Sequence, residues 1–229
     1  MVQKVTLSWS GGKDSAIALM ELSHDPRYTI ESLLTTVTAG YDRISMHGVR
    51  VSLLEEQASS LGLPLMKVMI PQDSSNEQYE SAMRRILVRA QADGITAVAF
   101  GDLFLEDIRR YREEKLSQIG MKALFPLWKR DTHKLAKSFL EAGFKAVLVC
   151  VDSRVLDRSF AGRAFDDSLL ADLPRNVDPC GENGEFHTFV NAGPIFSRSI
   201  PVRQGEIVLR ENRFWYCDLS SAEEVRDFN

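Results

Sequence analysis

The first pattern that could do chemistry is a short polar loop at residues 10–15. Its two adjacent glycines let the backbone turn sharply and approach a ligand closely, because no Cβ stands in the way. The amides at the start of the helix that follows, aided by its positive dipole end, favour an oxyanion. Hydroxyls and an ammonium add donors, and the aspartate beside them indicates a Mg²⁺ ion shared with the phosphates. The expected phosphate contacts are Ser10, Gly11, Gly12, Lys13, Asp14 and Ser15, with Asp14 as the metal ligand.

Two well-known phosphate-binding patterns do not fit this loop. Walker A needs four residues between its first glycine and Gly-Lys-Ser/Thr, and the dinucleotide pattern Gly-x-Gly-x-x-Gly is also absent. An alternative is an ordinary helix start, in which Asp14 or Ser15 caps the helix and the glycines only turn the chain. The direct succession of strand, loop and helix is more specific than either feature alone. We therefore expect a site for the diphosphate end of a nucleotide.

A second group of polar residues lies late in the chain, on a predicted turn that enters a strand. Glu182 and Glu185 flank Gly184, and His187 lies two residues beyond Glu185, on the same face of a regular strand. Such carboxylates could bind an ammonium ion, take a proton from an attacking amine or ligate Mg²⁺. A solvated acidic turn with a hydrogen-bonded histidine is the alternative. The catalytic candidates are these three residues together with Lys13.

Single cysteines and histidines point less clearly to a site. Cys180 could be a nucleophile, but no partner cysteine lies near it in the sequence, so a small, partly buried residue is favoured. Cys150 lies in an apolar run and is expected in the core. His47 lies in a loop that could border the adenine or the acceptor, although a solvated loop histidine is commoner. Neither a Cys-x-x-Cys pair nor zinc-ligand spacing occurs.

The composition is that of a globular protein. With 44% hydrophobic and 26% charged residues among 229, a disordered or fibrous chain is excluded. A formal charge of −4 argues against a general electrostatic grip on nucleic acid. The longest apolar stretch, at residues 146–151, is too short to cross a bilayer, and the chain opens on a strand-like run rather than a signal peptide. We expect a reduced, cytoplasmic protein with no membrane partner.

Short β-branched runs alternate with longer amphipathic segments over the first two thirds of the chain. The pattern predicts strands at residues 5–9, 30–37, 65–70 and 95–100, and helices at 14–22, 51–61, 76–92 and 106–119. This alternation implies right-handed crossovers and a parallel sheet covered on both faces. The predicted fold class is α/β, with a doubly wound parallel sheet.

The pattern changes near residue 129. A strand or extended link at residues 121–128 precedes a helix capped by Asp131 or Thr132 and reaching residue 142, and then a strand at 145–151. Short strands follow at residues 186–190, 195–200, 206–210 and 213–218. We predict a nucleotide-binding domain at 1–128 and a smaller α+β acceptor domain at 129–229. Because ligands gather at the carboxyl ends of strands, Thr36, Gly101 and Asp102 join the expected nucleotide contacts.

A charged run at residues 109–115 mixes both signs. Glu106 and Arg109, and Arg109 and Glu113, are spaced to pair along a helix. The simplest interpretation is a solvated helix face. The alternative is an arginine surface near the acceptor.

The loop sequence Ser-Gly-Gly-x-Asp-Ser directly after the first strand resembles the signature of the N-type ATP pyrophosphatases, or PP-loop enzymes. Within that superfamily the chain most resembles the diphthine–ammonia ligase (diphthamide synthase, ATP-binding) family. Three further stretches carry this resemblance, at residues 101–113, 126–144 and 180–196. The chain departs from the family pattern at Asp107-Ile108, Tyr111, Asn183 and His187, where Tyr-Gln, arginine, glycine and glutamate are usual.

The resemblance implies an adenine-nucleotide α-hydrolase-like (HUP-type) fold and a specific activity. Such a ligase uses ATP and Mg²⁺ to adenylate an acceptor, releases pyrophosphate and transfers ammonia or another amine. The acceptor would be a modified protein side chain or a small molecule, and the strand-rich tail could supply a homo-oligomer interface. Two alternatives remain open: a PP-loop enzyme that modifies tRNA, and a non-catalytic adenine-nucleotide sensor.

Overall fold

The computed structural model describes residues 2–40, 43–44 and 48–222, and the chain forms two compact units. Unit 1 comprises Met1–Ser10, Asp14–Ser45 and Gly62–Lys129. Unit 2 comprises Gly11–Lys13, Met46–Leu61 and Arg130–Asn229. His47, considered above as a site residue, lies outside the described residues.

A mainly parallel sheet forms the centre of unit 1. The parallel strands run in the order β4 (Leu65–Ile70), β2 (Tyr28–Thr38), β1 (Gln3–Ser8), β5 (Ala97–Ala99) and β6 (Lys122–Leu124). The two-residue strand β3 (Arg43–Ile44) pairs antiparallel with the end of β2. The strand order reverses between β1 and β5, which is the position where doubly wound sheets bind ligands. The predicted fold class is confirmed.

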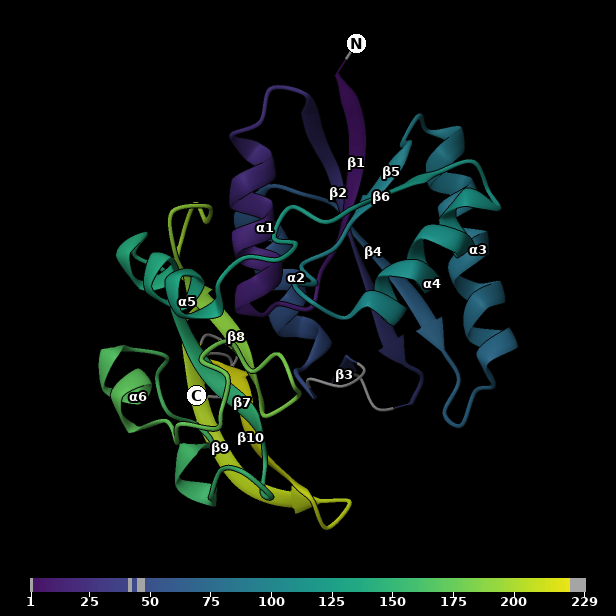
Figure 1. Ribbon diagram of the computed structural model, residues 1–229. Helices are drawn as coiled ribbons and strands as arrows, with labels where there is room; N and C mark the ends of the chain where they lie inside the picture. The colour runs from purple at the N-terminus through teal and green to yellow at the C-terminus, as the bar shows by residue number, and fades with distance from the viewer. Residues whose placement is uncertain (1, 41–42, 45–47, 223–229) are drawn as a thin grey trace, which may run out of the picture. The chain divides into compact units, whose positions relative to one another are not determined.

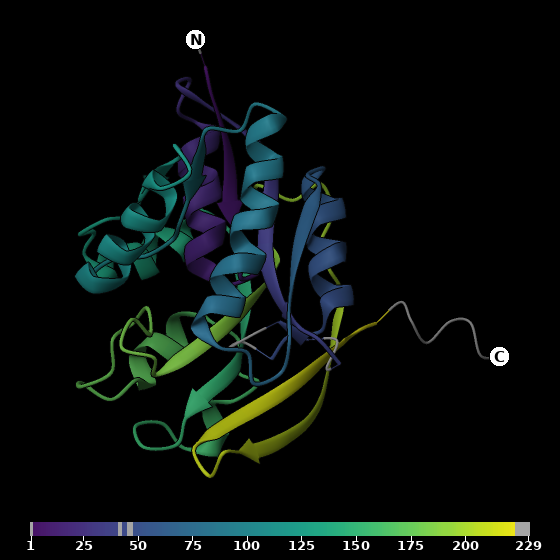
Figure 2. The ribbon, with the colours of Figure 1, turned by 90° about the vertical axis from the view of Figure 1, so that its right-hand side faces the viewer.

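Helices cover both faces of this sheet. Helix α1 (Lys13–Ser23) lies on one side, while α3 (Asn76–Ala92) and α4 (Glu106–Ser117) lie on the other (Figure 1). Figure 2 looks onto the second side, where α3 crosses in front of the strands. Helix α3 begins with a capping box, in which the Ser75 hydroxyl accepts from the Gln78 amide and the Gln78 side chain accepts from the Ser75 amide.

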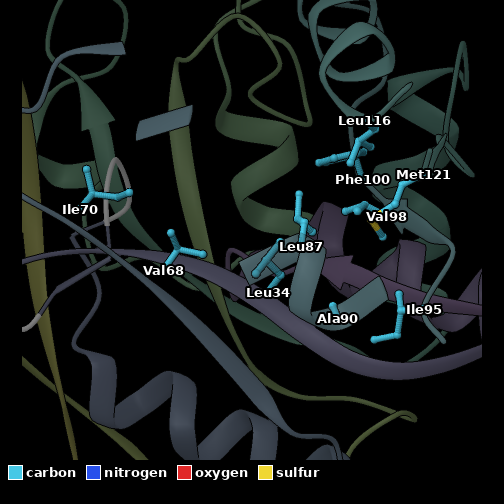
Figure 3. Packing of buried hydrophobic residues seen from close by; sticks show 10 residues of the cluster. All are labelled: Leu34, Val68, Ile70, Leu87, Ala90, Ile95, Val98, Phe100, Leu116 and Met121. Atoms are coloured by element: carbon cyan, nitrogen blue, oxygen red, sulfur yellow. The ribbon is translucent and has the colours of Figure 1, made fainter. Parts of the chain in front are cut away.

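An apolar cluster joins α3 and α4 to the sheet. The residues in Figure 3 come from β2, β4, β5 and these helices, or lie near an end of β5 or β6, and each is at most 7% exposed. The alternate apolar residues of the strands meet the apolar stripe of each helix, which removes both from water. The cluster consists of Leu34, Val68, Ile70, Leu87, Ala90, Ile95, Val98, Phe100, Leu116 and Met121.

Unit 2 contains an antiparallel sheet with the order β8 (Phe186–Ala192), β7 (Lys145–Asp152), β10 (Phe214–Ser221) and β9 (Val202–Arg210). Strands β9 and β10 form a long hairpin (Figure 2) whose turn residues Glu211 and Asn212 have positive φ. The unit also contains the helices α2 (Val51–Leu61), α5 (Thr132–Glu141) and α6 (Asp167–Asp172), and a 3₁₀ turn, η1 (Arg158–Phe160). Asp131, one of the two residues predicted as the cap, caps α5 by accepting from the Lys134 amide.

One predicted strand is wrong. Residues 195–200 form no strand, because their backbone groups bond elsewhere. The Phe196 amide closes a turn on the Gly193 carbonyl, and the Ser197 and Arg198 amides donate to the carbonyl and the hydroxyl of Ser60, near the end of α2. Helix α6 and the turn η1 were not predicted, because they are too short to show a helical repeat.

Two early stretches, Gly11–Lys13 and Met46–Leu61, group with the late residues in unit 2. The division into domains at 1–128 and 129–229 stays a prediction, since packing contacts do not measure independent folding. Among the described residues, no helix is long and apolar enough to cross a membrane.

Candidate functional site

In unit 1 the polar loop leaves β1 at the point where the strand order reverses. Leu7 pairs with Leu33 of β2 on one side and with Ala99 of β5 on the other. The hydroxyl oxygens of Ser10 and Ser15 lie 3.4 Å apart, so both side chains lie at the start of α1. The structure therefore places these two predicted residues at the edge of the sheet that binds ligands in this fold class.

Gly101 brings the end of β5 against the start of α1. A Cβ at this glycine would lie 2.9 Å from the carbonyl carbon of Asp14 and 3.1 Å from the nitrogen of Ser15. Only a residue without a side chain allows this approach. Asp14 and Ser15 were predicted from the polar loop and Gly101 from the end of a later strand, and the structure brings these two parts of the sequence together.

Asp102 follows at the same edge and is held by an arginine. Arg112 of α4 forms an ion pair with its carboxylate and lies 4.1 Å from the centroid of the Phe100 ring. Burial raises the pKa of Asp102, and the nearby Asp14 adds to this, while Arg112 opposes it. The carboxyl groups of Asp14 and Asp102 are therefore close enough to interact electrostatically.

Arg112 is a residue that sequence reasoning missed. It lies in the run interpreted as a solvated helix face, yet its side chain is largely buried, and burial lowers its pKa. The spacing of the arginines could have indicated it, because Arg112 lies three residues after Arg109 and both therefore lie on one face of α4. Arg109 pairs with Glu113 at 2.8 Å, as predicted, and its guanidinium lies 4.6 Å from the Trp128 ring centroid. Glu106 pairs instead with Lys129, at 3.5 Å.

Thr36 lies inside β2, whereas the sequence placed it at the end of the strand. It pairs with Val68 of β4 and is half-buried. Leu34 pairs with Ser8, the last residue of β1, so Thr36 extends past the end of that strand. It lies on the carboxyl side of the sheet, as expected of a nucleotide contact.

In unit 2 the loop residues Gly11–Lys13 run along β8. The Val190 amide donates to the Gly11 carbonyl at 2.8 Å, and the Lys13 amide donates to the Thr188 hydroxyl at 3.1 Å. Gly11 has a φ of 76°, a left-handed conformation that glycine adopts readily and that fits the sharp turn predicted here. The side chain of Gln57, from α2, also donates to the Gly11 carbonyl, at 3.1 Å.

Lys13 is buried, with 3% of its surface exposed. Its ammonium donates to the carbonyl oxygen of Cys180 and lies 5.8 Å from the centroid of the Phe186 ring. The structure thus brings Lys13 to the acidic turn, which is the second predicted constellation. Cys180 itself is 1% exposed, and its thiol donates to the Thr132 carbonyl at 3.3 Å, as expected of a structural cysteine.

Glu185 organises the acidic turn. Its carboxylate accepts from the Asp178 amide at 3.0 Å and from the Asn183 amide and side chain at 2.8 and 2.9 Å. Only 4% of the residue is exposed. Glu182 is half-buried, and its amide lies 3.5 Å from the Asp178 carboxylate.

His187 follows on β8, opposite Cys150 of β7. Burial, with a smaller contribution from the charge of Lys13, lowers the pKa of His187 to about 4. The imidazole is therefore neutral at physiological pH. Cys150 is buried in the core, as predicted, and burial raises the pKa of its thiol to about 12.

The described residues contain no group of three or more His, Cys, Asp or Glu side chains that could hold a metal ion. Asp14 remains the predicted protein ligand of a Mg²⁺ ion.

A doubly wound parallel sheet with a Ser-Gly-Gly-x-Asp-Ser loop after its first strand places this chain in the PP-loop superfamily. Sequence models of diphthamide synthase match nearly the whole chain, the N-terminal domain over residues 3–123 and the C-terminal domain over residues 131–225. The chain belongs to the diphthamide synthase family.

Three similar proteins are each named diphthine–ammonia ligase. That of Schizosaccharomyces pombe is 26% identical over 228 residues, which cover 87% of this chain but 36% of the yeast protein. That of Homo sapiens is 22% identical over 178 residues, covering 75% of this chain and 66% of the human protein. That of Mus musculus is 24% identical over 222 residues, covering 87% of this chain and 83% of the mouse protein. The chain thus spans only part of the yeast and human proteins.

Proposed function

We propose that this chain is an ATP-dependent, amide-forming ligase that adenylates an acceptor, releases pyrophosphate and transfers ammonia or another amine. The observation that carries the proposal is the contact of Gly101 with the start of α1. This contact brings the start of α1 to the carboxyl end of β5, where the strand order reverses, and a helix start at that edge of the sheet offers backbone amides to a phosphate. The name of the relatives, diphthine–ammonia ligase, supports a ligase that uses ammonia, with diphthine as one candidate acceptor.

The polar loop would hold the β- and γ-phosphates. Anions are stabilised at a helix start by backbone amides and the helix dipole, and the two serine hydroxyls lie in the same place. Stabilising charge on the departing pyrophosphate lowers the barrier to adenylation. The proposed nucleotide contacts are Ser10, Gly11, Gly12, Lys13, Asp14, Ser15, Thr36, Gly101 and Asp102.

Asp14 would hold a Mg²⁺ ion. A carboxylate in the first turn of α1 fits a hard cation that takes its remaining ligands from phosphate oxygens and water. The nearby Asp102 carboxylate is oriented by Arg112 and adds negative potential. When bound, the ion would neutralise phosphate charge and make pyrophosphate a better leaving group.

The acidic turn would serve the transfer step. The attacking amine forms a carbon–nitrogen bond to the activated carbon, the bond from that carbon to the AMP oxygen breaks, and the amine loses a proton. The neutral imidazole of His187 can accept a hydrogen bond from the amine, and the half-buried Glu182 can accept the proton. Glu185 would hold the turn that carries Glu182.

The identity of the products tests this proposal. ATP labelled in its α- and γ-phosphates is incubated with the chain, Mg²⁺, ammonium and diphthine-bearing acceptor protein. We expect AMP and pyrophosphate. Recovery of ADP and phosphate would reject the reaction class, and ATP binding without either product would favour a nucleotide sensor. Product formation that requires tRNA would favour the RNA-modifying alternative.

Two substitutions assign the roles. Lys13→Ala should weaken nucleotide handling, whereas Glu185→Gln should leave ATP binding intact and stop transfer. Glu206→Gln makes the same chemical change at an exposed position of β9 and is the control. Normal product formation by a folded Glu185→Gln variant would contradict the role given to the acidic turn.

A further inference from the structure

Strand β8 lies at the edge of its sheet, and the polar loop occupies its open side. In the four-stranded order, β8 pairs only with β7. On its other side, the Val190 amide donates to the Gly11 carbonyl, and the Thr188 hydroxyl accepts from the Lys13 amide. The first bond joins two backbones and the second joins the loop backbone to a side chain, so β8 holds the loop at two points.

These two bonds fix the direction of the peptide groups between them. The described residues contain no cis peptide, and in a trans peptide the carbonyl and the N–H point in opposite directions. Because the Gly11 carbonyl points toward β8, the amide of Gly12 points away from it. The bond from β8 to the Gly11 carbonyl therefore sets the direction of the Gly12 amide, which points to the side of the loop away from β8.

Gln57 strengthens this arrangement from α2. Its side-chain nitrogen donates to the Val190 carbonyl at 2.6 Å and to the Gly11 carbonyl at 3.1 Å. The residue is fully buried, and its side-chain oxygen would lie 2.8 Å from a Cβ placed on Gly11. Gln57 thus bridges the strand and the loop at the one loop residue with a left-handed backbone.

We propose that Thr188 and Gln57 are positioning residues that hold the polar loop in its phosphate-binding conformation. The inference rests on the proposed function, since it assumes that the loop binds the phosphates of ATP. A diglycine segment loses much conformational freedom when it is ordered. With the loop already ordered by Thr188 and Gln57, ATP binding does not bear that cost.

The Lys13 amide provides a test that needs no substrate. Lys13 is the first residue of α1, and the first amides of a helix have no acceptor within the helix. Hydrogen exchange of the nucleotide-free chain should show slow exchange at this amide. Thr188→Val, which keeps the shape and removes the acceptor, should make it exchange faster, and Thr188→Ser should restore slow exchange. Rapid exchange at the Lys13 amide of the unmodified chain would overturn the proposal.

Affinities for Mg·ATP and for AMP, measured by calorimetry on the full chain, provide the second test. Thr188→Val and Gln57→Met should each weaken Mg·ATP binding about tenfold and leave AMP binding unchanged, because AMP lacks the phosphates that the loop would hold. Thr188→Ser should bind Mg·ATP as the unmodified chain does. A purely structural effect would not discriminate between these two nucleotides.

Ser60→Ala is the matched control. Ser60 is a buried polar residue of α2 that bonds to Arg198 and makes no bond to the loop. It should leave Mg·ATP affinity unchanged. If the unmodified chain binds no Mg·ATP, the proposed function fails. If it does and both Thr188→Val and Gln57→Met bind equally well, the positioning role alone fails.

Discussion

The residues that could do chemistry are held by specific protein partners. Lys13 donates to the Cys180 carbonyl, Asp102 pairs with Arg112, and Glu185 accepts three N–H groups. A buried charged group with hydrogen-bond partners is fixed in place, and breaking its partnership costs free energy. Substitutions at these positions therefore change both the site and the stability of the fold.

Glu185→Gln should lower the free energy of unfolding by about 1–3 kcal/mol. The amide that replaces the carboxylate brings its own donors against the N–H groups of Asp178 and Asn183. Urea denaturation measures this change. Glu206→Gln, at an exposed position, should stay within about 0.5 kcal/mol of the unmodified chain. An equal effect of the two substitutions would contradict the structural role of Glu185.

His187 should make the fold less stable in mild acid. Its pKa is about 4 in the folded chain and 6.5 as a free side chain, so between these values the unfolded chain binds more protons. This contribution to stability is present above pH 6.5 and is lost as the pH falls toward 4. The free energy of unfolding should drop by about 2 kcal/mol from this group between pH 7 and pH 5.

Chemical denaturation at these two pH values tests the assignment to His187. The variant His187→Gln cannot titrate and should lose this part of the pH dependence. His24→Gln changes an exposed histidine and should keep it. An unchanged pH dependence in His187→Gln would show that other groups cause it.

At the scale of elements, the carboxyl ends of β1 and β5 and the start of α1 meet at one edge of the sheet of unit 1, which is the proposed nucleotide site. Gly101 decides how closely these elements approach, because its missing side chain leaves room for the backbone of Asp14. The polar residues of the loop and of the segment after β5 therefore reach the same place although about ninety residues separate them.

Gly101→Ala should push α1 away from β5. The added Cβ would lie within 3.1 Å of three backbone atoms of Asp14 and Ser15, and backbone cannot rotate aside as a side chain can. We expect a loss of about 1–3 kcal/mol in unfolding free energy, together with weaker ATP binding by calorimetry. Gly205→Ala in β9, where the nearest atom would be 3.4 Å away, is the control. If both variants bind ATP normally, the close approach is not needed for the site.

At the scale of the whole molecule, ligand binding and folding are linked. A ligand that binds only the folded chain raises its stability, by about 2.7 kcal/mol at a concentration of 100 times the dissociation constant. Mg·ATP should therefore raise the unfolding temperature in a concentration-dependent way, and adenosine at the same concentration should raise it less, because it lacks the phosphates. Thermal unfolding followed by circular dichroism measures both. Equal shifts would mean that the phosphates add nothing to binding.

The sequence determined the class of fold and the family. Alternating strands and helices predicted the parallel sheet, since apolar periodicity and helix caps are local properties. The loop motif and the acidic turn were visible for the same reason, because their residues are neighbours in the chain. Single segments that lack a repeat, such as α6, escaped prediction, and residues 195–200 were mistaken for a strand.

Only the tertiary structure showed which distant residues hold the site. Nothing in the sequence near Gly11 indicates that Gln57 and Val190 bond to it, nor that Lys13 reaches Cys180. Arg112 looked like a solvated charge until the fold buried it beside Asp102. The sequence encodes local preferences of a few residues at a time. Contacts between separate segments depend on how the whole chain packs, and that packing decides how the loop is held.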